Sequence, residues 1–304
     1  MKKALAIVSI LLSFGSFAQQ DFQNSQYMFN LFSINPAYAG SNDVLSVNVS
    51  HRSQFVGFEG APNTQQFSIH APVTKKKIGL GLEITNDVIG PRKVLGVHTA
   101  YAYRVKIGPG QLGFGLKAGI YNYTYNWDIL NYQDNTEDLI GTGTESKLVP
   151  NFNFGMYYHD RINYAGIELA HLNNPSIYSN DSITDVQAKL SSHISAFAGR
   201  AFELNNKLVL KPSFLVRFAQ NAPGYADVNV SVLYNRRFWL GASYRTNKAL
   251  IFIAQVYINP KLKLGYCYDL LLNKLSTFQG GAHELYLGFD IDFNKSTALS
   301  PRYF

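Results

Sequence analysis

Few residues in this sequence have the spacing that an enzyme or a metal centre requires. Gly108–Gly113 has the G-x-G-x-x-G spacing of a dinucleotide-binding loop, but the residues after it alternate like a strand, and such a loop needs a helix N-terminus to hold the phosphate. No segment has the G-x-S-x-G pattern of a nucleophile elbow. The seven histidines are scattered, and the adjacent His283 and Glu284 would point to opposite faces of a strand. We therefore expect no catalytic, cofactor or metal site.

Polar and charged residues that recur on one side of alternating segments form the main candidate site. The candidates for a lumen or partner-binding role are Arg52, Gln54, Glu83, Arg104, Lys117, Lys211, Arg217, Arg245, Asp269, His283, Glu284 and Asp290. Opposite charges on neighbouring strands can pair across a barrel. Two interpretations stay open: a structural network inside a lumen, and the lining of a pore or of a docking surface for an inserted plug or peptide.

The elements that would position these residues are β-strands, because large apolar residues recur at every second position. In residues 77–85, Leu80 and Leu82 share one face with two isoleucines, whereas Glu83 lies on the other face with two glycines. A period of two is the pattern of a strand. The fourteen predicted strands lie near residues 44–54, 65–72, 77–86, 94–105, 111–123, 150–159, 162–172, 188–202, 208–218, 227–234, 238–245, 249–258, 262–270 and 282–293.

The connections between these strands alternate in length. Every second connection is a tight turn rich in Asn, Gly, Pro and basic residues. The other connections are long, at 55–64, 87–93, 124–149, 173–186, 219–226 and 271–281, with the short 246–248 as the exception. The longest apolar run in the mature chain is Ala249–Ala254, far below the ~18–20 residues of a membrane helix.

This alternation is typical of outer-membrane barrels. We predict an all-β fold: a transmembrane antiparallel up-and-down β-barrel of about 14 strands over residues 44–293, with short periplasmic turns and long extracellular loops. The alternatives are a soluble β-sandwich and a large lipocalin-like barrel. Basic residues in the short turns favour contact with outer-membrane lipid, or else with an acidic periplasmic partner.

The chain begins like a secreted protein. Lys2 and Lys3 precede a mostly apolar stretch, and Ser16-Phe17-Ala18 is a small-x-small cleavage site. We expect residues 1–18 to be a signal peptide that is cleaved near Ala18. The single cysteine, Cys267, has no second cysteine with which to form an internal disulfide.

An aromatic segment precedes the first predicted strand. Residues 25–40 carry no charge, and such an apolar segment would be costly to leave in water. We therefore expect residues 19–43 to be a periplasmic segment that plugs the barrel mouth or lumen, or docks a periplasmic partner. Its motif residues are Tyr27, Phe29, Phe32, Asn35, Pro36, Tyr38 and Gly40. A periplasmic tail, residues 294–304, ends in the motif Pro301, Arg302, Tyr303 and Phe304.

Motifs along nearly the whole mature chain resemble the PorP/SprF family of type IX secretion system membrane proteins. They are SQYMFN and INPAYAG within residues 25–40, HRSQFVGFEGAPNTQQFSIHAP at 51–72, GLGLEITNDVIGP at 79–91, AGIELAHLNNPS at 165–176, LKPSFLVRF at 210–218, FWLGASYR at 238–245, GYCYD at 265–269, GAHELYLGFD at 281–290 and SPRYF at 300–304. The resemblance implies an outer-membrane barrel of gliding or type IX-secreting bacteria. It also implies partners: secreted proteins with a type B C-terminal sorting domain, and periplasmic components of the system.

From the resemblance we expect a non-enzymatic barrel that binds such a sorting domain and helps to deliver or anchor the secreted protein at the cell surface. We expect no nucleic-acid partner. Recognition is expected in the long loops, through side-chain pockets and hydrogen bonds, because barrel closure removes free strand edges. The alternatives are a diffusion porin or small-solute channel, and an outer-membrane barrel hydrolase.

Overall fold

The computed structural model describes residues 22–73, 77–130, 143–179, 187–219, 222–272 and 279–292. The predicted signal peptide lies outside the described residues. The C-terminal tail with Pro301, Arg302, Tyr303 and Phe304 lies outside them too. No described helix is long and apolar enough to cross a membrane.

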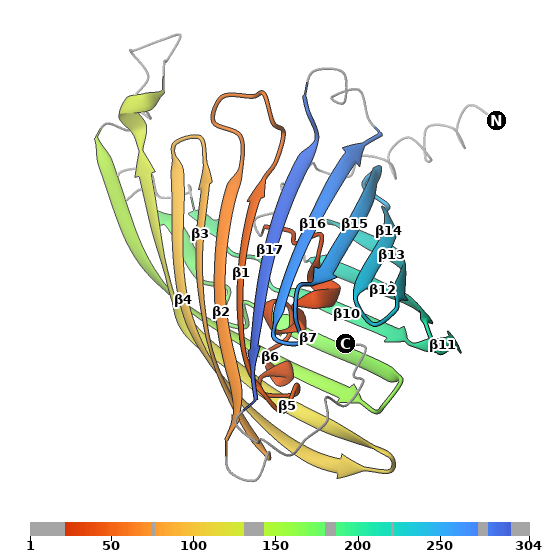
Figure 1. Cartoon of the computed structure of the whole chain (residues 1–304). Coiled ribbons are helices and arrows are strands. Elements are labelled where there is room, and N and C mark those ends of the chain that lie inside the picture. Colours follow the sequence, from red (N-terminus) through yellow and green to blue (C-terminus); the bar gives the residue numbers. More distant parts are fainter. Residues whose placement is uncertain are drawn as a thin grey trace, which may run out of the picture.

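The described chain forms one antiparallel sheet that closes into a barrel (Figure 1). Its strands are β1 (Leu45–Ser53), β2 (Asn63–Val73), β3 (Ile78–Ile89), β4 (Arg92–Ile107), β5 (Gly110–Asn126), β6 (Thr144–His159), β7 (Asn163–Ala170), β10 (His193–Arg200), β11 (Phe202–Asn205), β12 (Leu208–Ala219), β13 (Ala222–Tyr234), β14 (Phe238–Arg245), β15 (Ala249–Tyr257), β16 (Leu262–Leu271) and β17 (Ala282–Ile291).

The barrel has fourteen strand positions, as predicted. Neighbouring strands pair in chain order, and β1 pairs with β17 to close the ring. The short β11 follows β10 along the same edge of β12, so the two occupy one position. A separate two-stranded hairpin, β8 (Ser176–Ser179) with β9 (Gln187–Lys189), lies in the β7–β10 connection.

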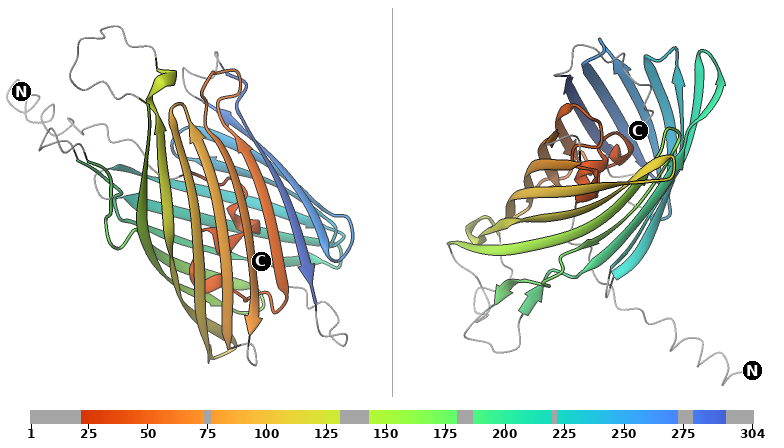
Figure 2. Two further views of the ribbon diagram at one scale, coloured as in Figure 1. Left: turned by 90° about the vertical axis from the view of Figure 1, so that its left-hand side faces the viewer. Right: turned by 90° about the horizontal axis from the view of Figure 1, so that it is seen from below.

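The outer and inner faces of the barrel differ as the alternation predicted. On β4, for example, Leu95, Val97 and Tyr101 are exposed outward, whereas His98 and Arg104 are buried inward. An apolar exterior and a polar interior are the reverse of a soluble protein and match a barrel in lipid. Figure 2 shows the tilted strands of this barrel from the side and from below.

Two of the expected long connections are in fact short. Only Gly90 and Pro91 separate β3 from β4, and β13 begins at Ala222, three positions after β12 ends at Ala219. The expectation of long loops at 87–93 and 219–226 was therefore wrong. The polar residues there belong to strands that extend further than the apolar alternation does. The long connections that remain are 54–62, 127–143, 171–192 and 272–281, and they define the long-loop end of the barrel.

Candidate functional site: the plugged lumen and its mouth

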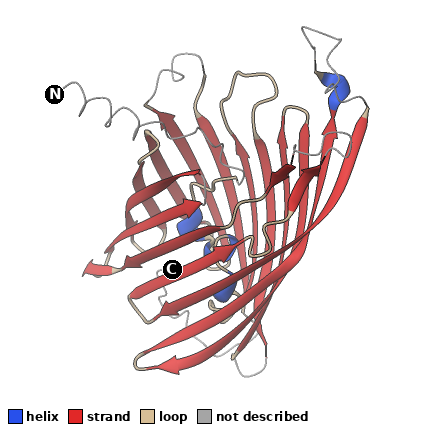
Figure 3. Ribbon diagram, turned by 180° about the vertical axis from the view of Figure 1, so that it is seen from behind, coloured by secondary structure: helices blue, strands red, loops and turns tan. Residues whose placement is uncertain are grey.

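The N-terminal segment lies inside the barrel (Figure 3). It folds as three short 3-10 helices: η1 (Tyr27–Phe29), η2 (Leu31–Ser33) and η3 (Pro36–Tyr38). Tyr27, Phe32 and Tyr38 are buried, and Phe29 is partly buried against the same cluster. We call residues 22–43 the plug, because the segment supplies eight of the eighteen buried residues in the apolar cluster of the lumen.

The plug runs along the barrel axis from one end toward the other. Phe22 lines a cavity together with Asp87 and Arg92, at the long-loop ends of β3 and β4. Gly40, at the other end, donates its N–H to His70 near the short turns. Of the expected alternatives, the structure therefore agrees with a plug in the lumen, but the plug starts near the long-loop end and not at the end with the short turns.

Asn35 and Gly40 shape the plug as their positions in the motif suggested. The Asn35 side chain accepts a hydrogen bond from the Ala37 N–H, 2.9 Å, and so caps η3. Pro36 occupies the first helical position, where its missing N–H costs nothing. Gly40 has φ 69°, a left-handed conformation that glycine adopts without strain, and there the chain turns toward β1.

Glycines on the inner face of the strands make room for the plug. A side-chain carbon added at Gly79 would overlap the Ala39 carbonyl, and one at Gly115 would overlap the Ala37 backbone. One added at Gly155 would overlap the Asn35 side chain. The glycine-dotted polar face seen in the sequence is therefore the contact surface of the plug.

A buried network of charges ties the start of the plug to the wall. Arg52 pairs with Asp269 at 2.7 Å and with Glu284 at 3.1 Å, and all three side chains are almost fully buried. The Ser25 N–H donates to Glu284, 2.8 Å, and the Ser25 hydroxyl donates to Asp269, 2.7 Å. Arg245 adds a second cation through its hydrogen bond to Ser25, 3.3 Å. Because buried charges need partners, the plug completes this network.

Three further cations hold the rest of the plug. Lys117 pairs with Glu83 at 3.2 Å and approaches the Ser33 carbonyl at 3.5 Å. Arg104 donates to the Ala39 carbonyl, 2.6 Å. Lys211 lies over the Trp239 ring, 4.7 Å, and over the Phe29 ring, 5.4 Å.

Most of the sequence-predicted lumen residues therefore lie inside the barrel around the plug, in several separate groups. Those placed inside the barrel are Arg52, Glu83, Arg104, Lys117, Lys211, Arg245, Asp269 and Glu284, with Asp290 near the short turns and Arg217 half-buried at the cavity. Gln54 lies in the β1–β2 loop. His283 contradicts the prediction of a lumen position, because it hydrogen-bonds Tyr266 on the outer face.

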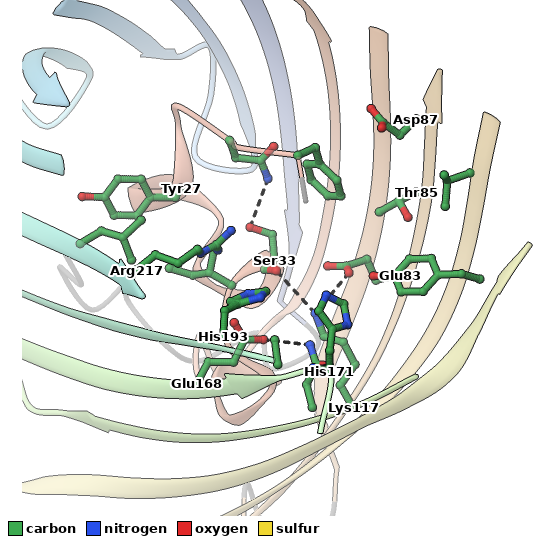
Figure 4. Close-up of a pocket in the computed structure, with 18 of the residues that line it drawn as sticks. Tyr27, Ser33, Glu83, Thr85, Asp87, Lys117, Glu168, His171, His193 and Arg217 are labelled. Atoms are coloured by element: carbon green, nitrogen blue, oxygen red, sulfur yellow. Dashed lines mark hydrogen bonds and ion pairs between the residues drawn. The ribbon is translucent and has the colours of Figure 1, made fainter. Parts of the chain in front are cut away.

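A small cavity of about 70 Å³ remains between the plug and the long-loop end (Figure 4). The Lys117–Glu83 and Arg92–Asp87 pairs line it, so these charges are already balanced. Glu168, His171 and His193 also line it, and sequence reasoning did not select them. Glu168 could have been predicted, because the alternation places it on the polar face of residues 162–172. The same is true of Asp227 in its strand.

The chain matches the family model described as type IX secretion system membrane protein PorP/SprF over residues 16–289. The chain belongs to the PorP/SprF family. This confirms the resemblance drawn from the sequence motifs, and the barrel with its apolar exterior is that of an outer-membrane protein. No curated protein matches the chain.

Three solved structures are similar to this PorP/SprF member at low sequence identity, and the first of them, with a TM-score above 0.5, shares its fold. The Ralstonia pickettii toluene transporter TbuX is similar with a TM-score of 0.52 and 12% identity, over 86% of this chain and 93% of the transporter. The CymD monoaromatic hydrocarbon channel has a TM-score of 0.49 and 11% identity, over 88% and 91% of the two chains. A Pseudomonas aeruginosa FadL homologue has a TM-score of 0.49 and 10% identity, over 93% and 97%.

Proposed function

We propose that this PorP/SprF protein binds a secreted protein through its type B C-terminal sorting domain and helps to deliver or anchor it at the cell surface, without catalysis. Family membership supports a role in type IX secretion. The plug is the single structural observation that favours binding over conduction. It fills the lumen, and its Ser25 hydrogen-bonds the buried carboxylates of Asp269 and Glu284, so a passage would first require those hydrogen bonds to break.

The long-loop end offers a preorganised surface for such a partner. The β1–β2 loop and the β16–β17 connection are joined by two backbone hydrogen bonds, from Val56 to Gly281 at 3.1 Å and from Gly280 to Val56 at 2.7 Å. Val56 and Phe58 are exposed on this joined pair of loops. Exposed apolar side chains on a fixed backbone favour protein binding, because little ordering entropy is lost.

At the opposite end, the short turns expose basic residues that suit anionic groups. Arg161, Lys207, Arg236, Arg237 and Lys261 lie in or beside these turns and are exposed. We propose that this end faces the periplasm, where the turns lie near outer-membrane lipid and periplasmic components of the secretion system.

Co-purification tests the proposed function. The barrel is tagged and expressed with the C-terminal sorting domain of a large secreted protein encoded beside it. Stable association in detergent, and loss of surface display in a strain that lacks the barrel, are the expected results. Failure to associate, with the secreted protein still displayed in the deletion strain, would rule the proposal out.

A further inference from the structure

At the long-loop end, strand β6 extends beyond the strand that pairs with its second edge. Strand β6 pairs with β5 along its whole length, from Thr144 to His159. Its other edge pairs with β7 only from Phe154 to His159. The upper half of β6 therefore has an edge with no strand beside it among the described residues, and the β5–β6 hairpin rises above the neighbouring strands (Figure 1).

The hydrogen-bond register defines which groups lie on that edge. The Trp127 N–H bonds the Gly143 carbonyl, so that pair, and every second pair below it, exchanges hydrogen bonds between β5 and β6. Glu145, Lys147 and Val149 thus direct their N–H and C=O groups to β5. Thr144, Ser146 and Leu148 direct theirs away from β5, to the open side. We call these three residues the open edge.

The chain after β7 continues the ladder only part of the way. Leu172 N–H bonds the Phe152 carbonyl, 2.9 Å, and the Asn173 side chain bonds the Pro150 carbonyl, 2.8 Å. The chain then turns to the inner face, where Ile177 packs with Val149. Within the described residues, no backbone group meets the open edge from the outside.

The open edge lies outside the hydrocarbon of the membrane. Unpaired backbone groups cost several kcal/mol each in hydrocarbon, so three alternate residues with open groups belong in water, beyond the lipid. Leu148 is nevertheless 66% exposed. An uncovered strand edge beside a large exposed apolar side chain is the usual template for strand addition.

We propose that an extended segment of the secreted partner adds as a strand to the open edge of β6, over Thr144, Ser146 and Leu148. The proposal rests on the proposed function for the identity of the partner. The occupant must be extended polypeptide, because only a β-strand offers donors and acceptors at this alternating spacing. We expected from the sequence that barrel closure leaves no edge for strand addition. That expectation does not hold at the open edge of β6.

A proline substitution tests this inference on the intact barrel, with the sorting-domain fragment as the probe. Ser146→Pro removes an outward N–H and leaves the β5 ladder intact, since proline is tolerated on a strand edge. Ser146→Val is the matched control, because it also removes the hydroxyl that meets Thr124 but keeps the N–H. We expect about tenfold weaker binding for Ser146→Pro and near-wild-type binding for Ser146→Val.

Amide hydrogen exchange supplies the second readout. Partner binding should protect the N–H groups of Ser146 and Leu148, while those of Lys147 and Val149 are protected already by β5. Equal binding by wild type and both variants, without this alternating protection, would overturn strand addition and leave the proposed function standing. Protection of the same amides at high barrel concentration without partner would identify a second copy as the occupant and also overturn it. Absence of any binding by the wild type would instead refute the proposed function.

Discussion

At the scale of single residues, buried charge does most to fix the plug. The Arg52 side chain pairs with two buried carboxylates, Asp269 and Glu284. Removal of one partner from a buried ion pair leaves a charge without compensation, which is strongly destabilising, whereas an exposed pair contributes little. Loss of an arginine side chain should therefore destabilise the barrel much more inside the lumen than at the short turns.

Arg52→Met should destabilise the folded barrel by about 3–5 kcal/mol, because Glu284 would lose its ion-pair partner and Asp269 would keep only Arg245, at 3.7 Å. Urea unfolding in lipid vesicles measures this loss. Arg161→Met is the control, since the Arg161–Glu203 pair is 73% and 44% exposed, and it should change the stability by less than about 1 kcal/mol. Equal losses for the two variants would contradict the buried network.

Gly115→Val should displace the plug, because the added side chain would occupy the space of the Ala37 backbone. Overpacking of this kind costs about 1–3 kcal/mol. The measurement is protease cleavage within residues 22–43 in the folded barrel. Ala118→Val, a half-exposed position on the outer face of the same strand, should leave the plug as resistant as in the wild type.

At the scale of elements, the plug depends on local capping as much as on burial. The Asn35 amide also donates to the Met156 and Ile167 carbonyls of β6 and β7, at 3.0 and 3.1 Å. One side chain thus closes η3 and joins it to two strands. This is a physical reason for the Asn-Pro pair that the sequence motif contained.

Asn35→Ala should loosen η3 by about 1–3 kcal/mol, since it removes the cap and leaves buried groups without a partner. Faster amide exchange of Ala37 and Tyr38, in an otherwise folded barrel, is the expected result. Asn163→Ala, which removes a side-chain hydrogen bond to Asp160 in a short turn, should leave the exchange of these two amides unchanged. Unchanged exchange in Asn35→Ala would show that burial alone holds η3.

The strands could be predicted from the sequence because each one faces lipid on one side, so its apolar alternation is strong. Where strands rise beyond the apolar belt, as β3 and β4 do near Gly90, alternation fades and strand ends were misjudged. The lumen residues could be predicted from the polar face of the same strands. The prediction failed for His283, because a polar residue near a membrane interface can lie on either face.

The path of the plug through the barrel could not be predicted from the sequence. Its apolar character predicted that something covers it, but the partners include five glycines on four different strands: Gly79, Gly113, Gly115, Gly155 and Gly265. Such contacts depend on the closure and curvature of the barrel, which no local pattern encodes. The open edge of β6 could not be predicted from the sequence either. It exists because β7 ends at Ala170, whereas β6 extends further toward the long-loop end, to Thr144.

At the scale of the whole molecule, a barrel of fourteen strands is wide enough to conduct unless something fills it. Here the chain's own N-terminal segment does so, and its buried network favours a closed resting state. We therefore place the proposed partner binding on the outer loops and rim, with the lumen serving mainly as the scaffold that holds the plug.

Closure of the lumen by residues 22–43 is tested most directly by conductance of the purified full-length barrel in a planar lipid bilayer. We predict no steady open conductance for the full chain, and a steady open channel after deletion of residues 22–40. A large, steady conductance of the intact protein, equal to that of the deletion variant, would contradict a plugged barrel and favour a diffusion porin.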